Sequence, residues 1–356
     1  QVGSTFKTIV YAAALARKAP PGTPKEKRAD YRFTLATVLS DKPIVMKAHE
    51  AELKSWKNRR ISAEGDEQWK PGNSGDKYNG DINIHGRSSS RDTLLRSAYI
   101  LSRNVPTIDL AQKVGIKEIM SFAKKLGIET PLQPDLSIAL GSAALTLEEI
   151  TRAHAVFPAG GVRVDPHFVE HVESRDGTVL FDLQASLAAK APAPVIDPKV
   201  AYVITRLMLD VASAGTATEA AKQLKRPSGG KTGTTNDYVD AWYVGFTPDI
   251  LTGVWVGYDQ VRSLGVGETG AEAALPIWID YMKGVTEGTP VKTFTAPEGV
   301  VKLKVDRSSG KLARRDQKPE EILETWFVRG TEPTEISVAG RIEDEPNLFE
   351  IDPGMH

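Results

Sequence analysis

Apolar positions in the first half of the chain recur mostly with helical spacing. The run after Ser4 is rich in alanine and holds no helix breaker before Pro20, so it predicts a buried helix with Ser4 as its N-cap. Thr146 and Glu149 form a capping box that predicts the start of another helix. Amphipathic spacing predicts further helices at residues 90–102, 107–126 and 198–214.

Strand-like patterns lie mainly in the second half. Apolar stretches on both sides of Asp176-Gly177 predict a β-hairpin. Further extended segments are predicted at residues 131–140, 241–246, 251–258 and 300–305. Residues from 320 onward are acidic and mixed, which predicts a partly disordered tail.

Composition narrows the class of protein. The 356 residues are 40% hydrophobic with a formal net charge of −1, so the chain can bury one large core or two modest ones and carries no field that attracts nucleic acid. It has no cysteine, which excludes disulfides and thiol nucleophiles. No apolar run approaches the ~20 residues of a membrane helix. His167 and His171 lie in a strand-like pattern with no further ligand type nearby, so no metal site is predicted.

Ser4 and Lys7 are the first candidate for chemistry. Residues three apart on a helix lie about 5–6 Å apart at Cβ, so the lysine amine can reach the serine hydroxyl. A serine becomes a strong nucleophile when a neighbour takes its proton, and a lysine can do so once burial or another cation lowers its pKa.

Lys231 lies in a second polar stretch, rich in glycine. Gly230-Lys231-Thr232 suggests a phosphate loop, but that motif needs a glycine where the chain has Lys225. The stretch instead predicts an edge strand facing the serine, where glycines let a substrate backbone pair with it. There Lys231 supplies a cation, and Thr232 and Thr234 supply hydroxyls for a carboxylate.

Three motifs in order carry a resemblance. Ser4-Thr5-Phe6-Lys7, Ser102-Arg103-Asn104 and Lys231-Thr232-Gly233 resemble the motif set of serine acyltransferases that recognise penicillin. Longer stretches are similar to the transpeptidase domain of bifunctional (class A) penicillin-binding proteins, at residues 3–7, 140–142, 159–168, 233–237, 266–270, 276–278 and 330–335.

The resemblance implies an α+β fold (an α/β sandwich) of the penicillin-binding-protein and serine β-lactamase type, with an antiparallel sheet flanked by helices. Residues 1–290 would form the D,D-transpeptidase domain and 291–356 a C-terminal strand and tail. The interval from Ser4 to Ser102 is longer than usual in the family, so residues 20–90 are interpreted as an insertion or irregular region. We interpret the sequence as a fragment: the family's glycosyltransferase domain, membrane anchor, first strands and first helix would lie upstream of Gln1.

The same resemblance completes the set of roles. Ser4 is the expected nucleophile and Lys7 the base, while Ser102 relays the proton to the departing amine. Asn104 would bond the donor peptide and steady Lys7, and Lys231 would set protonation through like-charge repulsion. The resemblance implies an oxyanion hole made of the Ser4 and Thr234 N–H groups, and a substrate strand of Thr232, Gly233, Thr234 and Thr235.

The expected reaction joins peptidoglycan stem peptides ending in D-Ala-D-Ala, and β-lactams would acylate Ser4. A carboxypeptidase or β-lactamase that uses water stays open, as does a non-catalytic sensor or scaffold. No metal, nucleotide or organic cofactor is expected. Expected partners include other cell-wall synthesis or division proteins, without nucleic acid, and with membrane contact only through upstream residues. The expected location is extracytoplasmic, in the periplasm or on the outer face of the cytoplasmic membrane.

Overall fold

The computed structural model describes residues 1–42, 44, 46–47, 60–61, 67–69, 71–73, 92–189 and 193–338. Its α-helices are α1 (Lys7–Ala16), α2 (Leu95–Ile100), α3 (Val105–Val114), α4 (Ile116–Lys125), α5 (Leu147–Ala155), α6 (Leu183–Ala189), α7 (Pro198–Ala214), α8 (Thr218–Leu224) and α9 (Leu275–Thr286). Its strands are β1 (Val38–Ser40), β2 (Met46–Lys47), β3 (Arg60–Ile61), β4 (Glu67–Trp69), β5 (Asp92–Leu94), β6 (His171–Glu173), β7 (Val179–Asp182), β8 (Gly229–Thr234), β9 (Ala241–Phe246), β10 (Leu251–Val256), β11 (Val300–Asp306) and β12 (Ile322–Val328).

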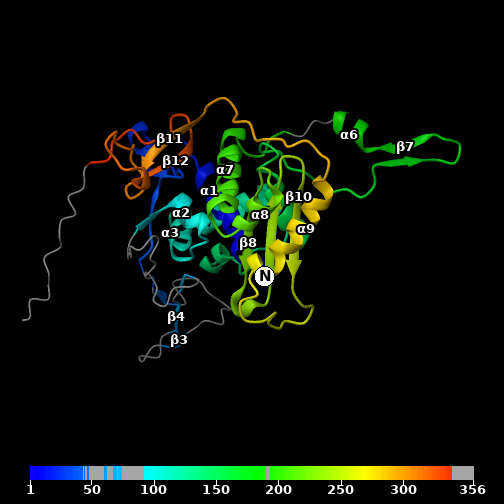
Figure 1. The fold of residues 1–356 in the computed structure, drawn as a ribbon, viewed down its shortest axis with the longest axis horizontal. Coiled ribbons are helices and arrows are strands. Elements are labelled where there is room, and N and C mark those ends of the chain that lie inside the picture. Colours follow the sequence, from blue (N-terminus) through cyan, green and yellow to red (C-terminus); the bar gives the residue numbers. More distant parts are fainter. Residues whose placement is uncertain are drawn as a thin grey trace, which may run out of the picture.

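An antiparallel sheet with the order β10-β9-β8 lies beside the helices (Figure 1). Lys231 on β8 pairs with Val244 on β9, which in turn pairs with Gly253 on β10. Helix α7 packs against β8, while α9 and a one-turn π-helix, η5 (Gly270–Ala274), pack against β9 and β10. Among the described strands β8 is therefore an edge, and this edge faces the start of the chain.

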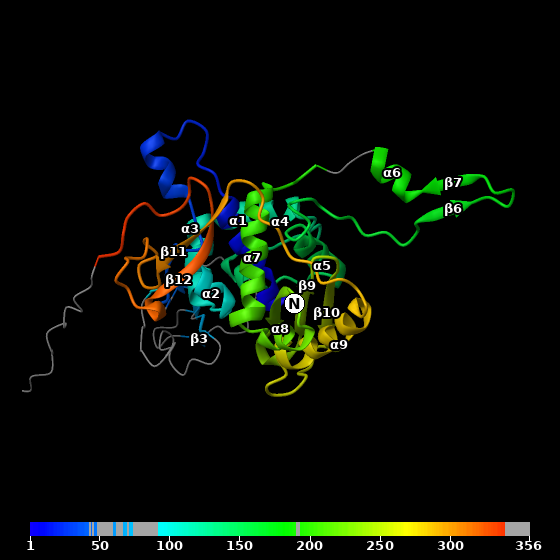
Figure 2. The same cartoon turned by 45° about the horizontal axis from the view of Figure 1, so that its top comes forward.

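Helix α1 runs through the middle of the core (Figure 2). Every residue from Lys7 to Ala14 is buried, and α3, α4 and α7 contact the helix. Alanine side chains allow this close approach, because they add little width to the helix. The apolar run after Ser4 thus forms the predicted buried helix, and burial on all sides leaves few conformations open to Lys7.

Ser4 itself was predicted wrongly as an N-cap. It lies inside a 3₁₀ turn, η1 (Gly3–Phe6), that precedes α1, and no side chain caps either element. The predicted helix at 107–126 is two helices, because Gly115 at φ +94° separates α3 from α4. Part of the segment predicted as extended, 131–140, forms a 3₁₀ helix, η3 (Leu136–Leu140). The capping box of Thr146 and Glu149 and the full length of α7 are confirmed.

The C-terminal strands β11 and β12 pair over their whole length and bury Val305, Leu323 and Phe327. They fold back on α7, where the rings of Tyr202 and Trp326 meet edge to face with centroids 5.5 Å apart. The prediction of disorder from residue 320 is therefore wrong for β12, while residues 339–356 lie outside the described part.

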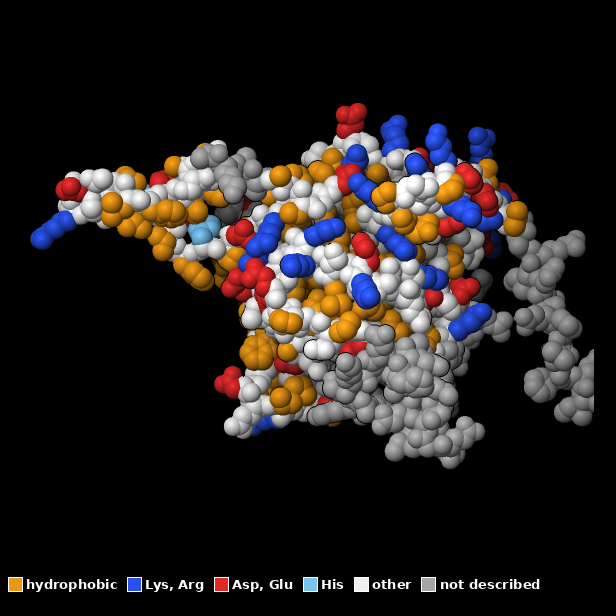
Figure 3. All heavy atoms as spheres, turned by 180° about the vertical axis from the view of Figure 1, so that it is seen from behind, with side chains coloured by type: hydrophobic (Ala, Val, Ile, Leu, Met, Phe, Trp, Pro, Cys, Tyr) orange, Lys and Arg blue, Asp and Glu red, His pale blue; other side chains and the backbone are white. Residues whose placement is uncertain are grey.

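An arm made of β6, β7 and α6 projects from the body (Figures 1 and 3). The predicted hairpin is present, with Val172 opposite Phe181, and several of its apolar side chains are exposed, Phe168 most of all. In the part of the chain that the structure describes, no one helix has both the length and the apolar composition to cross a membrane; α7 and α8 meet these criteria only as a pair bent by 83°.

Candidate active site

The turn that holds Ser4 is seated directly on the edge of β8. A Cβ atom on Gly3, which has φ +52°, would lie 2.5 Å from the Thr234 carbonyl oxygen. A Cβ on Gly233 would lie 2.6 Å from the carbonyl oxygen of Val2, and one on Gly141 would lie 1.8 Å from that of Gly3. Glycine at these positions therefore lets three backbone segments meet, and Ser4 comes to lie partly exposed beside the strand.

Lys7 lies one turn after Ser4 and is completely buried. Its Nζ donates hydrogen bonds of 2.6 Å to the Ser102 carbonyl oxygen and 2.6 Å to Asn104 Oδ1, and it lies 3.4 Å from Ser102 Oγ. A neutral amine has two N–H donors, and two oxygen acceptors take both. The lone pair is then left available for a proton from another group.

Lys231 approaches the same loop from the sheet. Its Nζ donates to Ser102 Oγ at 2.9 Å and to its neighbour's carbonyl oxygen on Thr232 at 3.0 Å. It also lies over the ring of Tyr99, 5.8 Å from the centroid. Ser102 Oγ is thus shared between two buried lysines, so the three sequence motifs meet around one hydroxyl.

Burial lowers the pKa of both lysines, and repulsion from nearby cations lowers that of Lys7 further. The pKa of Lys7 lies well below 10.5, because burial penalises its charge and the cations Lys231 and Arg103 lie nearby. Burial lowers the pKa of Lys231 to about 7. At neutral pH a deprotonated amine is therefore accessible at this site, which an exposed lysine does not provide.

The backbone N–H of Thr234 points away from the sheet. Thr235 N donates to the Asp240 carbonyl at 3.1 Å, and because hydrogen-bonded and non-hydrogen-bonded pairs alternate along an antiparallel ladder, the preceding N–H faces the open edge and η1. Ser4 is in the first turn of η1, where its own N–H has no acceptor within the helix. Two N–H donors on adjoining elements suit an oxyanion.

The hydroxyls of the predicted substrate strand have different hydrogen-bond partners. The hydroxyl of Thr232 contacts that of Thr216 at 2.7 Å, and Thr234 Oγ1 accepts from Gly270 N at 3.0 Å. Thr235 Oγ1 accepts from Asp240 N at 2.8 Å, so this side chain turns to the loop after the strand.

A chain of buried hydrogen bonds joins α1 to α2 and α5 through Thr8, Tyr99 and His154. Burial, with Lys231 as a further cause, lowers the pKa of His154 to about 4, so the ring is neutral. Its Nδ1 lies 2.8 Å from the Ile150 carbonyl and donates to it, which leaves Nε2 to accept from Thr8 Oγ1 at 3.0 Å. Thr8 Oγ1 in turn accepts from the Tyr99 hydroxyl at 2.8 Å. Sequence reasoning did not identify Tyr99 or His154, because their spacing fits any buried helix face.

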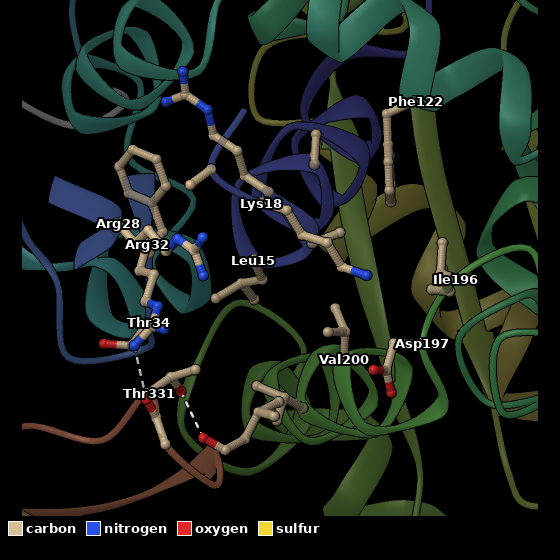
Figure 4. A pocket seen from close by; sticks show the side chains of 18 of the residues that line it. Leu15, Lys18, Arg28, Arg32, Thr34, Phe122, Ile196, Asp197, Val200 and Thr331 are labelled. Atoms are coloured by element: carbon tan, nitrogen blue, oxygen red, sulfur yellow. Dashed lines mark hydrogen bonds between the residues drawn. The ribbon is translucent and has the colours of Figure 1, made fainter. Parts of the chain in front are cut away.

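A cavity of about 1000 Å³ lies at the opposite end of α1 (Figure 4). Its lining includes Leu15, Lys18, Phe122 and Val200. The α1 residue of its lining that lies nearest to Lys7 is Ala13, about 9 Å along the helix at 1.5 Å per residue, so the cavity is distinct from the place where the motifs meet. Within the described ranges no three His, Cys, Asp or Glu residues are grouped to hold a metal ion.

Comparisons with known proteins identify the family. Residues 53–282 match the family model of the penicillin-binding protein transpeptidase domain, and residues 296–339 match that of the penicillin-binding protein 1A C-terminal domain. The chain belongs to the penicillin-binding protein transpeptidase family. It therefore contains a domain of the penicillin-binding protein transpeptidase type, with a penicillin-binding and β-lactamase-like fold. The first match begins at residue 53, after Ser4 and Lys7.

Full-length relatives are much longer. Penicillin-binding protein 1A of Neisseria gonorrhoeae is 33% identical over 302 residues, which cover 85% of this chain and 33% of the relative. The Pseudomonas aeruginosa protein of that name is 32% identical over 88% of this chain and 39% of its own length. The crystal structure of penicillin-binding protein 1A from Haemophilus influenzae has 28% identity and a TM-score of 0.76, covering 95% of this chain and 49% of that one. The chain thus spans about a third of the length of the curated relatives.

Proposed function

We propose that the chain is a serine D,D-transpeptidase that cross-links peptidoglycan stem peptides ending in D-Ala-D-Ala through an acyl-enzyme on Ser4. The observation that carries the proposal is the meeting of Lys7, Ser102 and Lys231 around one hydroxyl, one turn from Ser4. Membership of the transpeptidase family supports the reaction class. Domain boundaries at about residue 290, and the site roles below, belong to the same proposal.

Acylation begins with a proton transfer. Lys7 takes the proton of Ser4 Oγ as the oxygen bonds to the carbonyl carbon of the penultimate D-alanine. The Ser4 and Thr234 N–H groups stabilise the oxyanion, and losing one such donor typically costs about 2.7–4 kcal/mol of barrier. Lys7 then gives this proton to the departing nitrogen through Ser102 Oγ, the C–N bond breaks and D-alanine leaves, so that Lys7 is neutral again.

The second half of the reaction uses an amine. The amino group of a neighbouring stem peptide attacks the Ser4 ester, Lys7 takes its proton and passes it to Ser4 Oγ, and the C–O bond to Ser4 breaks to give a cross-link and the free hydroxyl. Asn104 bonds the donor peptide and steadies Lys7. The edge of β8, with Thr232, Gly233, Thr234 and Thr235, pairs with the donor backbone, and Lys231 attracts its carboxylate.

β-Lactams would acylate Ser4 and remain bound, because they mimic the donor peptide. Peptidoglycan lies outside the cytoplasmic membrane, so we place the reaction in the periplasm or on the membrane's outer face, alongside other cell-wall synthesis or division proteins.

A fluorescent penicillin tests the nucleophile. We expect stoichiometric covalent labelling of the chain, and none of a Ser4→Ala variant that melts normally. Labelling that persists in Ser4→Ala would refute the assignment.

Product analysis tests the acceptor. With a D-Ala-D-Ala donor and an amine acceptor, we expect a cross-linked dimer together with free D-alanine. Free D-alanine without dimer would make the chain a carboxypeptidase, and penicillin labelling without either product would make it a binder.

A further inference from the structure

A buried polar cluster is centred on Arg103, the middle residue of the Ser102–Asn104 loop. It consists of Arg103 together with Asp41 and Asn73, and all three are nearly inaccessible to solvent. Asp41 and Asn73 come from the region 20–90, whose sequence indicated no function. Both lie outside the three motifs.

The contacts of this cluster lead directly to Asn104. Arg103 forms a buried ion pair with Asp41 Oδ2 through Nε and Nη2, and Asn73 Nδ2 donates to Asp41 Oδ1 at 3.0 Å. Asn73 Oδ1 accepts from the backbone N–H of Asn104 at 2.7 Å and of Val105 at 3.1 Å. The result is a continuous chain of hydrogen bonds from Asp41 to the last residue of the loop.

The side chain of Asn104 is oriented by the same segment. Its Nδ2 donates to the Gly72 carbonyl at 2.6 Å, so its Oδ1 is turned toward Lys7 Nζ, also at 2.6 Å. The loop needs such support, because Ser102 has φ +55°, a conformation that costs energy for a residue with a Cβ and persists only where the surroundings enforce it. The two oxygens that bond Lys7 are therefore held in place from residues 41 and 72–73.

We propose that Asp41 and Asn73 are positioning residues for proton transfer between Ser4 and Lys7. Acting through Arg103 and Asn104, they hold the Ser102 carbonyl and Asn104 Oδ1 where both N–H groups of the neutral Lys7 amine bond to them, so that its lone pair is presented to Ser4. This proposal rests on the proposed function and adds two residues to it. A displacement of 1 Å in such a site is worth about 10²-fold in rate.

The test separates the rate of acylation from the amount of active protein. Asp41→Asn and Asn73→Ala are labelled with fluorescent penicillin at a range of concentrations, which gives the saturating rate constant, the half-saturating concentration and the final labelled fraction. We expect the saturating rate constant to fall about 10- to 100-fold, while the final labelled fraction stays that of the wild type. The half-saturating concentration should change less than about threefold, because both residues are buried.

Asp306→Asn is the matched control. Asp306 is another buried aspartate, at the end of β11, whose oxygens accept four hydrogen bonds from Ser308 and Ser309. It has no contact with the loop, so this variant should melt earlier but keep the wild-type rate constant. A double variant of Asn73→Ala with Asn104→Ala should react no more than about threefold slower than Asn104→Ala alone, because the two residues act in series.

Three results would overturn the proposal. The first is a reduced labelled fraction with an unchanged rate constant, which is the behaviour of a purely structural residue. The second is fully multiplicative losses in the double variant. If Asn73→Ala does not melt cooperatively, the milder variant Asn73→Ser is measured in its place. The third result is that neither Asn73→Ala nor Asn73→Ser folds. A wild type that penicillin does not label refutes the proposed function instead.

Discussion

Lys231 donates a 2.9 Å hydrogen bond to the hydroxyl of Ser102, 129 residues away in the sequence. The same hydroxyl lies 3.4 Å from Lys7 Nζ. Two buried amines that share one hydroxyl disfavour the doubly protonated state, so loss of a proton by Lys7 becomes easier when Lys231 keeps its own. Pairs of titratable groups whose environments differ in this way commonly divide the acid and base roles of a site.

Replacing Lys7 should stop acylation without unfolding the chain. Lys7→Met keeps the volume of the side chain but removes the amine, and a general base typically contributes 10²–10⁴-fold, so we expect labelling by fluorescent penicillin to slow by at least about 10²-fold. Lys7→Arg should be as slow, because a guanidinium does not lose its proton in proteins. If Lys7→Arg reacted at the wild-type rate, Lys7 would not be the base.

Lys231→Met should stabilise the fold while impairing acylation. The pKa of Lys231 is about 7 when folded and about 10.5 when unfolded, so burial of the charged form destabilises the fold fully below pH 7. Between pH 7 and 10.5 the unfolded chain binds the extra proton, so wild-type stability rises with pH. At pH 6 we expect the free energy of unfolding of Lys231→Met to exceed that of the wild type by about 1–4 kcal/mol, the range for replacing buried charges.

The difference in free energy of unfolding between Lys231→Met and the wild type should narrow as pH approaches 10. Urea denaturation at several pH values measures it. Lys222→Met serves as the control, since Lys222 is an exposed lysine on α8 paired with Glu219, and it should change stability by less than about 0.5 kcal/mol. A gap that does not vary with pH would contradict the assigned cause.

Much of the site could be predicted from sequence because each motif is local. The spacing of Ser4 and Lys7 places both on one helical turn, and glycines around Lys231 favour an edge strand wherever that strand lies. The same holds for α7, whose amphipathic period, N-cap Asp197 and terminal Gly215 all lie within the segment itself. Local rules decide these elements, and the structure agrees with them.

The features that could not be predicted from the sequence depend on contacts between distant residues. Asp41 meets Arg103 across 62 residues and Asn73 across 32, so nothing near either residue in the sequence indicates the pairing. The strand β12 is mostly apolar, with Glu324 as its one acidic residue, and is ordered by pairing with β11 and packing on α7; the acidic residues just before it led to the prediction of disorder. The 3₁₀ turn at Ser4 is likewise imposed by the close approach of Gly3 to Gly141 and β8, where helix propensity alone would give an ordinary start.

Glu149 should make stability depend on pH in the acid range. Burial alone would raise its pKa, but hydrogen bonds from Thr130 and Glu129 at 2.7–2.9 Å outweigh this and lower the pKa from 4.5 to about 2. The group therefore stabilises the fold above pH 4.5, and this contribution is lost as pH falls from 4.5 to 2.

Glu149→Gln should lower the free energy of unfolding by about 1 kcal/mol at pH 7, as expected for a capping residue. Between pH 4.5 and 2 the stability of this variant should decline less than that of the wild type. Thermal unfolding followed by circular dichroism across this range measures both. Glu118→Gln, at an exposed glutamate in the first turn of α4, should leave the acid profile unchanged. An identical acid decline in Glu149→Gln and the wild type would count against the hydrogen-bond argument.

Gly141→Ala should separate the Ser4 turn from the sheet. Gly141 has φ +79° and its added Cβ would lie 1.8 Å from the Gly3 carbonyl oxygen, which is backbone and cannot rotate away. Gly160→Ala is a matched control, because Gly160 has φ +70° with nothing within 4 Å of an added Cβ. Both variants carry the left-handed cost of about 1–2 kcal/mol, and only Gly141→Ala adds a clash, worth about 1–3 kcal/mol more. We expect Gly160→Ala to keep the wild-type acylation rate and Gly141→Ala to lose it, since Gly3 cannot shift without moving Ser4 away from Thr234. Equal melting temperatures and equal penicillin labelling in the two variants would show that the turn is not seated as described.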